Sequence, residues 1–198
     1  MKKIILSIVA VLGLGFANAQ DTPEGGFANG DAFISGGFGF GSSKTGDAKE
    51  NSFTITPSVG FFVTPNIALG GKLGYVSRTK DNGTIENKDN TFSVGVFGRY
   101  YTTPASKFSI FGELGVEYQT RTIGDDVKDS KDLKVNGFGI ELAPGVSYFL
   151  SKSFALEAKW GILGYNTAKA DVEGAKANND FNIGLDLSDI TLGLVYKF

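Results

Sequence analysis

The stretch FSIFGELGVEY, Phe108–Tyr118, places an apolar residue or glycine at every second position. Glu113 and Glu117 occupy positions between the apolar ones. A period of two gives a β-strand one apolar face and one polar face. A helix is disfavoured, because glycine and β-branched residues, which lower helix propensity, are frequent in runs of this kind. The stretch therefore predicts a strand whose two faces meet different surroundings.

The same alternation recurs along the chain and predicts eight strands in total. The other seven runs are Ala32–Phe40, Phe53–Val63, Ile67–Tyr75, Phe92–Tyr100, Phe138–Tyr148, Phe154–Ile162 and Ile190–Phe198. Upstream of the last run, Phe181–Leu187 alternates in the opposite phase. We expect a β-bulge near Asp186–Ser188 to reconcile the two phases, since one extra residue reverses which side faces out.

The connections between these runs alternate in length. The short links are Thr64–Asn66, Thr102–Lys107 and Ser151–Ser153, and the longer polar links are Ser43–Asn51, Thr79–Asn90, Thr122–Leu133 and Asn166–Asn178. Alternating short and long turns between eight strands are typical of an up-and-down antiparallel meander. The fold class predicted is all-β, an eight-stranded antiparallel up-and-down barrel.

Composition excludes several classes of function. The 198 residues include neither cysteine nor histidine, and the formal net charge is −2. Without cysteine there are no disulfides, thiol nucleophiles or cysteine-ligated metals. Without histidine the commonest general base and metal ligand is missing. The balanced charge does not indicate a nucleic-acid-binding protein.

The N-terminus has the organisation of a secretory signal peptide. Lys2 and Lys3 precede the apolar stretch Ile4–Phe16, and Ala17-Asn18-Ala19 forms a small-residue cleavage site. Cleavage after Ala19 would leave Gln20 as the first mature residue. We therefore divide the chain into a signal peptide (1–19), a short N-terminal segment (20–30) and the barrel domain (31–198).

Two kinds of closed barrel are compatible with the meander. A soluble, lipocalin-like barrel carries its apolar faces inside, whereas a membrane barrel turns an apolar band toward lipid and keeps a polar interior. Aromatic residues gather near both ends of the apolar faces, as two membrane–water interfaces require. Near the short turns these are Phe61, Tyr100, Phe108, Tyr148, Phe154, Tyr196 and Phe198, and near the long links Phe40, Phe53, Tyr75, Phe92, Tyr118 and Phe138. We therefore favour a transmembrane barrel.

The chain also resembles a known family. The signal peptide, the eight amphipathic runs and the terminal residues Leu192, Leu194, Tyr196 and Phe198 are similar to those of small outer-membrane β-barrel proteins, the OmpA-type transmembrane barrels of the porin family. The resemblance implies that the four terminal residues are an assembly signal for the barrel-assembly machinery. It also implies a Gram-negative outer-membrane location, with both termini in the periplasm.

Charged residues on the polar faces are the candidate site. We expect Lys72, Arg99, Glu113, Glu157 and Lys159 to form one interior layer near the short turns, and Arg78, Glu117, Arg121, Glu141 and Asp189 to lie closer to the long links. An eight-stranded barrel leaves an interior that side chains can fill. Buried charges must be paired, because an isolated buried charge is strongly unfavourable. We therefore predict a plugged lumen rather than an ion-selective channel.

No catalytic set, cofactor site or metal site is predicted. The paired carboxylates lack a nucleophile or a metal cluster beside them, and acidic residues of the Asp125–Asp132 link lack EF-hand spacing. We predict that the protein is a non-enzymatic outer-membrane protein with a structural or surface-interaction role. Its expected partners are outer-membrane lipids, the assembly machinery and an unidentified extracellular partner at the loops. The alternatives are a narrow channel for small solutes and, with less support, a lipid-modifying enzyme.

Overall fold

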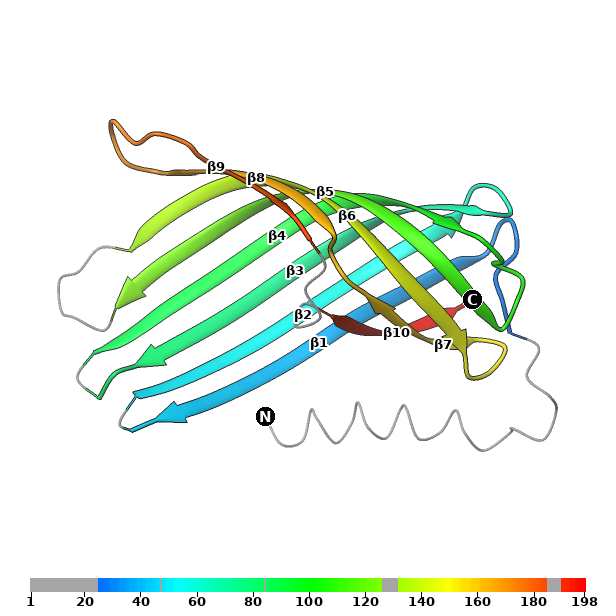
Figure 1. Ribbon diagram of the computed structural model, residues 1–198, viewed down its shortest axis with the longest axis horizontal. Coiled ribbons are helices and arrows are strands. Elements are labelled where there is room, and N and C mark those ends of the chain that lie inside the picture. Colours follow the sequence, from blue (N-terminus) through cyan, green and yellow to red (C-terminus); the bar gives the residue numbers. More distant parts are fainter. Residues whose placement is uncertain (1–24, 47, 84, 126–131, 185–189) are drawn as a thin grey trace.

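The strands run back and forth along one long axis (Figure 1), in a computed structural model that describes residues 25–46, 48–83, 85–125, 132–184 and 190–198. These residues form ten strand segments. Their bounds are β1 Ala32–Thr45, β2 Ala48–Phe62, β3 Ile67–Asp81, β4 Glu86–Tyr101, β5 Phe108–Asp125, β6 Leu133–Phe149, β7 Phe154–Lys159, β8 Leu163–Ala170, β9 Asn178–Ile183 and β10 Thr191–Lys197. Within the described residues, no helix is long and apolar enough to cross a membrane.

The ten segments occupy eight strand positions around a closed barrel. β1 to β6 pair in chain order, and β7 and β8 follow one another along β6. β9 and β10 form the last position, paired with β8 and β7. β10 also pairs with β1, from Phe33 opposite Lys197 to Gly37 opposite Gly193, which closes the sheet. The predicted eight-stranded antiparallel barrel is confirmed.

The seventh strand position contains a β-bulge that the sequence prediction missed. Two residues of β6, Ala143 and Pro144, lie opposite the three residues Trp160–Ile162. The carbonyl of Pro144 accepts a hydrogen bond from the backbone N–H of Trp160 at 3.1 Å. In an antiparallel sheet the N–H and the carbonyl of one residue point toward the same neighbouring strand. The carbonyl of Pro144 faces the seventh position, so the N–H that proline lacks is missing on that same side, where the bulge lies.

The bulge corrects the predicted run Phe154–Ile162. That run is a regular strand only to Lys159, and beyond the bulge the outward side changes from even-numbered residues such as Leu156 to odd-numbered ones such as Tyr165. The opposite phase predicted upstream of the last strand agrees with β9, where Phe181 pairs with the outward-facing Tyr165 and Asn182 lines the interior cavity. The bulge predicted near Asp186–Ser188 lies outside the described residues.

The strands are longer than predicted at the end of the barrel with the long links. The predicted links Ser43–Asn51 and Thr79–Asn90 are mostly strand, since β1 and β2 pair up to Thr45 opposite Ala48, and β3 and β4 up to Asp81 opposite Glu86. β5 and β8 likewise continue to Asp125 and Ala170. Polar residues in these extensions resemble loop sequence because both of their faces are hydrophilic. Backbone pairing therefore continues beyond the apolar band.

The apolar faces point outward. Every aromatic residue of the predicted band near the long links is exposed, and so are most of those in the band near the short turns. Large exposed aliphatic residues lie between the two bands, including Val59, Leu73, Val96, Leu114 and Ile140. This distribution excludes the soluble, lipocalin-like alternative, which needs its apolar faces inside.

A compact aromatic core fills the barrel interior near the short turns. It contains the rings of Phe27, Phe33, Phe62, Phe97, Tyr101, Phe111 and Phe149. Inward-facing glycines make room for these rings: a Cβ at Gly60 would lie 2.3 Å from the ring of Phe33, and one at Gly145 would lie 2.4 Å from that of Phe111. The interior is therefore apolar at this end and polar further along, where the charged residues begin.

Candidate functional site

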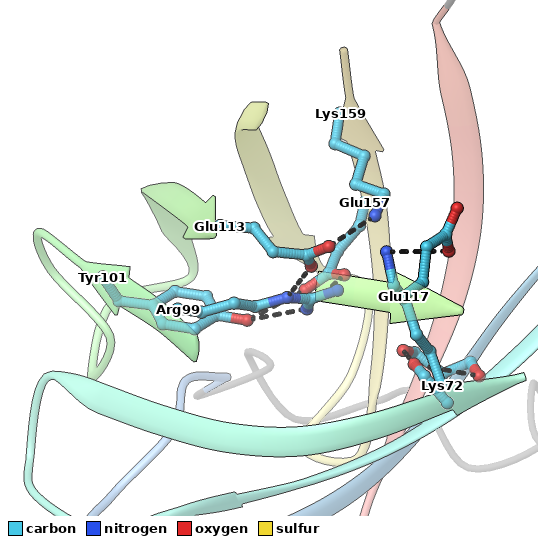
Figure 2. A network of polar contacts seen from close by, with 9 residues as sticks. Lys72, Arg99, Tyr101, Glu113, Glu117, Glu157 and Lys159 are labelled. Carbon is cyan, nitrogen blue, oxygen red and sulfur yellow. Dashed lines mark hydrogen bonds and ion pairs between the residues drawn. The ribbon is translucent and has the colours of Figure 1, made fainter. Parts of the chain in front are cut away.

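Arg99 lies at the centre of the charged residues inside the barrel (Figure 2). It projects inward from β4, directly opposite Glu113 of β5 in the antiparallel register. Glu157 comes from β7, which is not a neighbour of β4, so its contact with Arg99 crosses the lumen. The exposed fractions are 5% for Arg99, 2% for Glu113 and 7% for Glu157. The site is thus a bridge between opposite walls, nearly inaccessible to solvent.

The polar atoms in this bridge satisfy one another. Arg99 donates from Nε to Oε2 of Glu113 at 2.6 Å and from Nη1 to Oε2 of Glu157 at 2.9 Å. The other oxygen of Glu113 accepts from Nζ of Lys159 at 2.7 Å. Arg99 also donates to the hydroxyl of Tyr101, which donates to Oε1 of Glu157 at 3.2 Å. We call these five residues the charged layer.

Aromatic rings enclose the guanidinium of Arg99. Its central carbon lies 4.9 Å from the ring centroid of Phe97 and 4.8 Å from that of Phe111. Cation–π attraction strengthens when the cation is removed from water. Buried ion pairs also need complete hydrogen bonding to offset the loss of hydration. The two carboxylates and the rings together meet this need, which explains how so many charges are accommodated in a narrow interior.

The other predicted interior charges do not join this layer. Lys72 forms an ion pair with Glu117 at 3.5 Å, so these two residues, expected in different layers, lie side by side. Arg121 pairs with Asp89, a residue that the sequence prediction had placed in a loop. Arg78 and Glu141 are exposed and make no ion pair among the described residues, and Asp189 lies outside them.

A cavity lies next to the charged layer, on the side of the long hairpins. Its volume is about 320 Å³ and its polar lining includes Lys72, Glu117, Glu141, Lys159, Asn166 and Asn182. A second space of about 60 Å³ lies against the layer itself, beside Arg99 and Glu113. Among the described residues, no group of histidine, cysteine or acidic side chains is arranged to hold a metal ion. Both oxygens of Glu113 are engaged by cations, which leaves this carboxylate poorly suited to accept a proton.

Sequence reasoning missed two contributors to the site. Tyr101 follows the outward-facing Tyr100 and so points inward by alternation, but alternation does not reveal that its hydroxyl links Arg99 to Glu157. Phe27 lies outside any alternating run, yet its ring is buried against Tyr101 at a centroid distance of 5.5 Å. The only sequence signal for Phe27 is a large apolar residue within a polar, glycine-rich segment.

A closed sheet with an apolar exterior and a charged, hydrogen-bonded interior defines the class of integral membrane β-barrels. The model of the outer membrane protein β-barrel domain family matches residues 7–198, and the chain belongs to this family. Its members are proteins of the Gram-negative outer membrane. The resemblance inferred from the terminal residues and the strand pattern is thereby confirmed.

Solved structures of the same fold include two from Pseudomonas aeruginosa. The outer membrane protein OprG is 16% identical, with a TM-score of 0.55 over 89% of this chain and 99% of OprG. The N-terminal barrel domain of OprF is 13% identical, with a TM-score of 0.50 over 86% of this chain and 98% of that domain. A major outer membrane protein of Thermus thermophilus is also 13% identical, with a TM-score of 0.50 over 85% of this chain and 98% of that protein. No curated protein sequence matches the chain. At these identities the likeness establishes the fold alone.

Proposed function

We propose that this protein is a non-enzymatic component of the outer membrane, with a closed lumen and a structural or surface-interaction role. The observation that carries the proposal is the charged layer, in which Arg99 joins Glu113 on one wall to Glu157 across the lumen. An ion passing through would have to separate charge pairs that are almost fully buried. Separating such a pair leaves an uncompensated charge in a medium of low dielectric constant, which is costly.

Conductance tests the closed lumen directly. In planar bilayers the purified, folded protein is expected to give little stable conductance, because the charged layer blocks the lumen. Folding of the sample is checked on a gel, where the unboiled barrel should migrate differently from the boiled chain. Large, steady, ion-selective conductance would refute the closed lumen and establish the alternative, a narrow channel for small solutes.

The cavity beside the charged layer is the observation that favours this alternative. Its volume of about 320 Å³ and its polar lining are compatible with a water-filled vestibule. A vestibule conducts only if it continues past Arg99, and the aromatic core lies immediately beyond that residue. The closed lumen is therefore the better-supported proposal. A lipid-modifying activity has less support, because the chain contains no histidine and Glu113 is held by two cations.

We further propose that both termini and the short turns lie in the periplasm and that the long hairpins lie outside the cell. Small outer-membrane barrels have short periplasmic turns and longer extracellular connections. The hairpins of this chain extend beyond the exposed aromatic band, with polar pairs such as Lys80 and Glu50 at their surface. They are the surfaces proposed to meet an extracellular partner. The exterior faces lipid, and the terminal residues Leu192 to Phe198 engage the assembly machinery.

Epitope tags test this orientation. A tag inserted at Gly83, in the β3–β4 hairpin, should bind antibody on intact cells. A matched tag at Lys152, between β6 and β7, should bind only after the outer membrane is permeabilised. Both insertions lie in turns, which tolerate added residues better than paired strands do. Labelling of Lys152 but not Gly83 on intact cells would reverse the proposed topology.

A further inference from the structure

The segment Gly25–Asp31 precedes the first strand and enters the barrel end that carries the short turns. Phe27 is 2% exposed, and its ring stacks on Phe62 at a centroid distance of 4.7 Å. The ring also meets Phe149 at 4.9 Å and Tyr101 at 5.5 Å. These rings come from three different strands, β2, β4 and β6, so Phe27 fills a pocket formed by separate parts of the wall.

Hydrogen bonds hold the backbone of this segment in place. The N–H of Phe27 donates to the carbonyl of Pro104 at 2.7 Å, and that of Gly30 donates to the carbonyl of Phe62 at 2.9 Å. From the last strand, Nζ of Lys197 donates to the carbonyl of Gly26 at 2.6 Å. Lys197 also forms an ion pair with Asp31 at 3.4 Å. The segment is thus bound to the turn between β4 and β5, to β2 and to β10.

Two glycines make this binding sterically possible. Gly26 has a φ of +139°, and a Cβ there would lie 2.4 Å from the carbonyl oxygen of Ala105. A Cβ at Gly25 would lie 2.1 Å from Cβ of Phe149. Residues with side chains rarely adopt such a φ and could not approach the wall so closely. The sequence Gly25-Gly26-Phe27 is therefore matched to the pocket in backbone shape as well as in its aromatic ring.

We propose that the mouth of the barrel is a binding site for an extended glycine-glycine-aromatic segment, and that Gly25–Asp31 occupies it as an internal ligand. The bound segment closes the lumen on one side of the charged layer. It also ties β10 to the residues before β1, across the seam that closes the barrel. This closure lies on the short-turn side of the charged layer and meets it at Tyr101, whose ring contacts that of Phe27. A peptide with the same sequence, supplied separately, binds the mouth when the internal segment has been displaced.

A buried thiol reports on this closure. The chain contains no cysteine, and the inward-facing Ser147 of β6 is 1% exposed, so Ser147→Cys introduces a single buried probe. In the detergent-solubilised protein, a bulky water-soluble maleimide should label this thiol slowly. Adding Phe27→Ala should raise the labelling rate by about tenfold or more, as expected when an occluding segment opens locally. Labelling is scored on the folded band of an unboiled gel.

Control variants separate displacement of the segment from a general loss of stability. Phe61→Ala removes a neighbouring but outward-facing ring and should leave the Ser147→Cys rate unchanged. Asn166→Cys places a probe in the cavity beyond the charged layer, and its rate should not respond to Phe27→Ala. Gly26→Ala displaces the backbone while keeping the Phe27 ring, and should accelerate labelling of Ser147→Cys as Phe27→Ala does.

Addition of peptide completes the test. The heptapeptide Gly-Gly-Phe-Ala-Asn-Gly-Asp should slow labelling in the protein that carries Ser147→Cys and Phe27→Ala, and the same peptide with alanine in place of phenylalanine should not. If the rate stays slow in the folded Phe27→Ala and Gly26→Ala proteins, the segment does not close the mouth and the proposal is wrong. If labelling accelerates but neither peptide slows it, the mouth is closed by the segment without being a binding site. These results are read from labelling rates and do not depend on conductance, which both the charged layer and the bound segment would lower.

Discussion

Glu113→Ala is expected to lower the free energy of unfolding by about 3–5 kcal/mol, because it leaves buried cations without a partner. Glu113 is 2% exposed and accepts hydrogen bonds from Arg99 and from Lys159. Its removal leaves Lys159 without its carboxylate and Arg99 with Glu157 alone. Unfolding in urea within lipid vesicles or detergent, followed by tryptophan fluorescence and by the gel shift, measures the loss.

Two further variants identify charge imbalance as the cause. Glu117→Ala removes a carboxylate from the same strand, but its ion pair with Lys72 is longer and its side chain is 32% exposed. That variant should lose at most about 1 kcal/mol, as for exposed ion pairs. Adding Lys159→Met to Glu113→Ala removes one unpaired cation and should restore part of the lost stability. A Glu113→Ala protein as stable as the unchanged chain would show that these charges do not hold the layer together.

The fold was predictable because alternation is a local property of the sequence. Leu114 and Glu113 are adjacent, and the period of two places them on opposite faces of the strand. The aromatic bands at both ends of the apolar faces then assign Leu114 to lipid and Glu113 to the lumen. The same property could not locate the bulge at Trp160–Ile162, which depends on what lies across the sheet. Pro144 was the available signal, since a proline within a strand of a closed sheet indicates a bulge. The strand extensions were missed because their two polar faces resemble loop sequence.

Four members of the charged layer were predictable, but Lys72 was wrongly included and the connections between the members were not predictable. The alternation of inward and outward positions along each strand placed Arg99, Glu113, Glu157 and Lys159 inside the barrel. The structure brings these four together. Which carboxylate meets which cation depends on strand register and on closure of the barrel, and both are non-local. Arg99 and Glu157 are 58 residues apart and meet only because the sheet curves round on itself. The position of Phe27 could not be predicted from the alternation. This residue lies outside the strands, so no repeating pattern indicates whether its side chain faces the interior or the exterior.

The last strand, β10, closes the barrel by pairing with β1, and Phe198 follows it directly. Removing Phe198 is expected to abolish most assembly of the folded barrel while leaving export intact, because the resemblance assigns the terminal aromatic residue to recognition by the assembly machinery. Phe198 is exposed, and its ring meets that of Tyr196 at 5.1 Å. Its backbone N–H donates to the carbonyl of Ala32 at 3.0 Å, at the seam between the last strand and the first. The side chain is therefore available for recognition, while the backbone helps close the sheet.

Conservative variants separate these two contributions. Phe198→Ala keeps the backbone hydrogen bond to Ala32 and removes the ring, so it should lose assembly almost as completely as the deletion does. Phe198→Tyr keeps an aromatic ring and should assemble, and Phe108→Ala removes an exposed ring of the same band and should also assemble. The amount of heat-modifiable barrel in outer-membrane fractions measures assembly. The size of the chain, with the signal peptide removed, reports export. Normal assembly of Phe198→Ala would show that the terminal ring is not the recognition signal and that Phe198 contributes through its backbone.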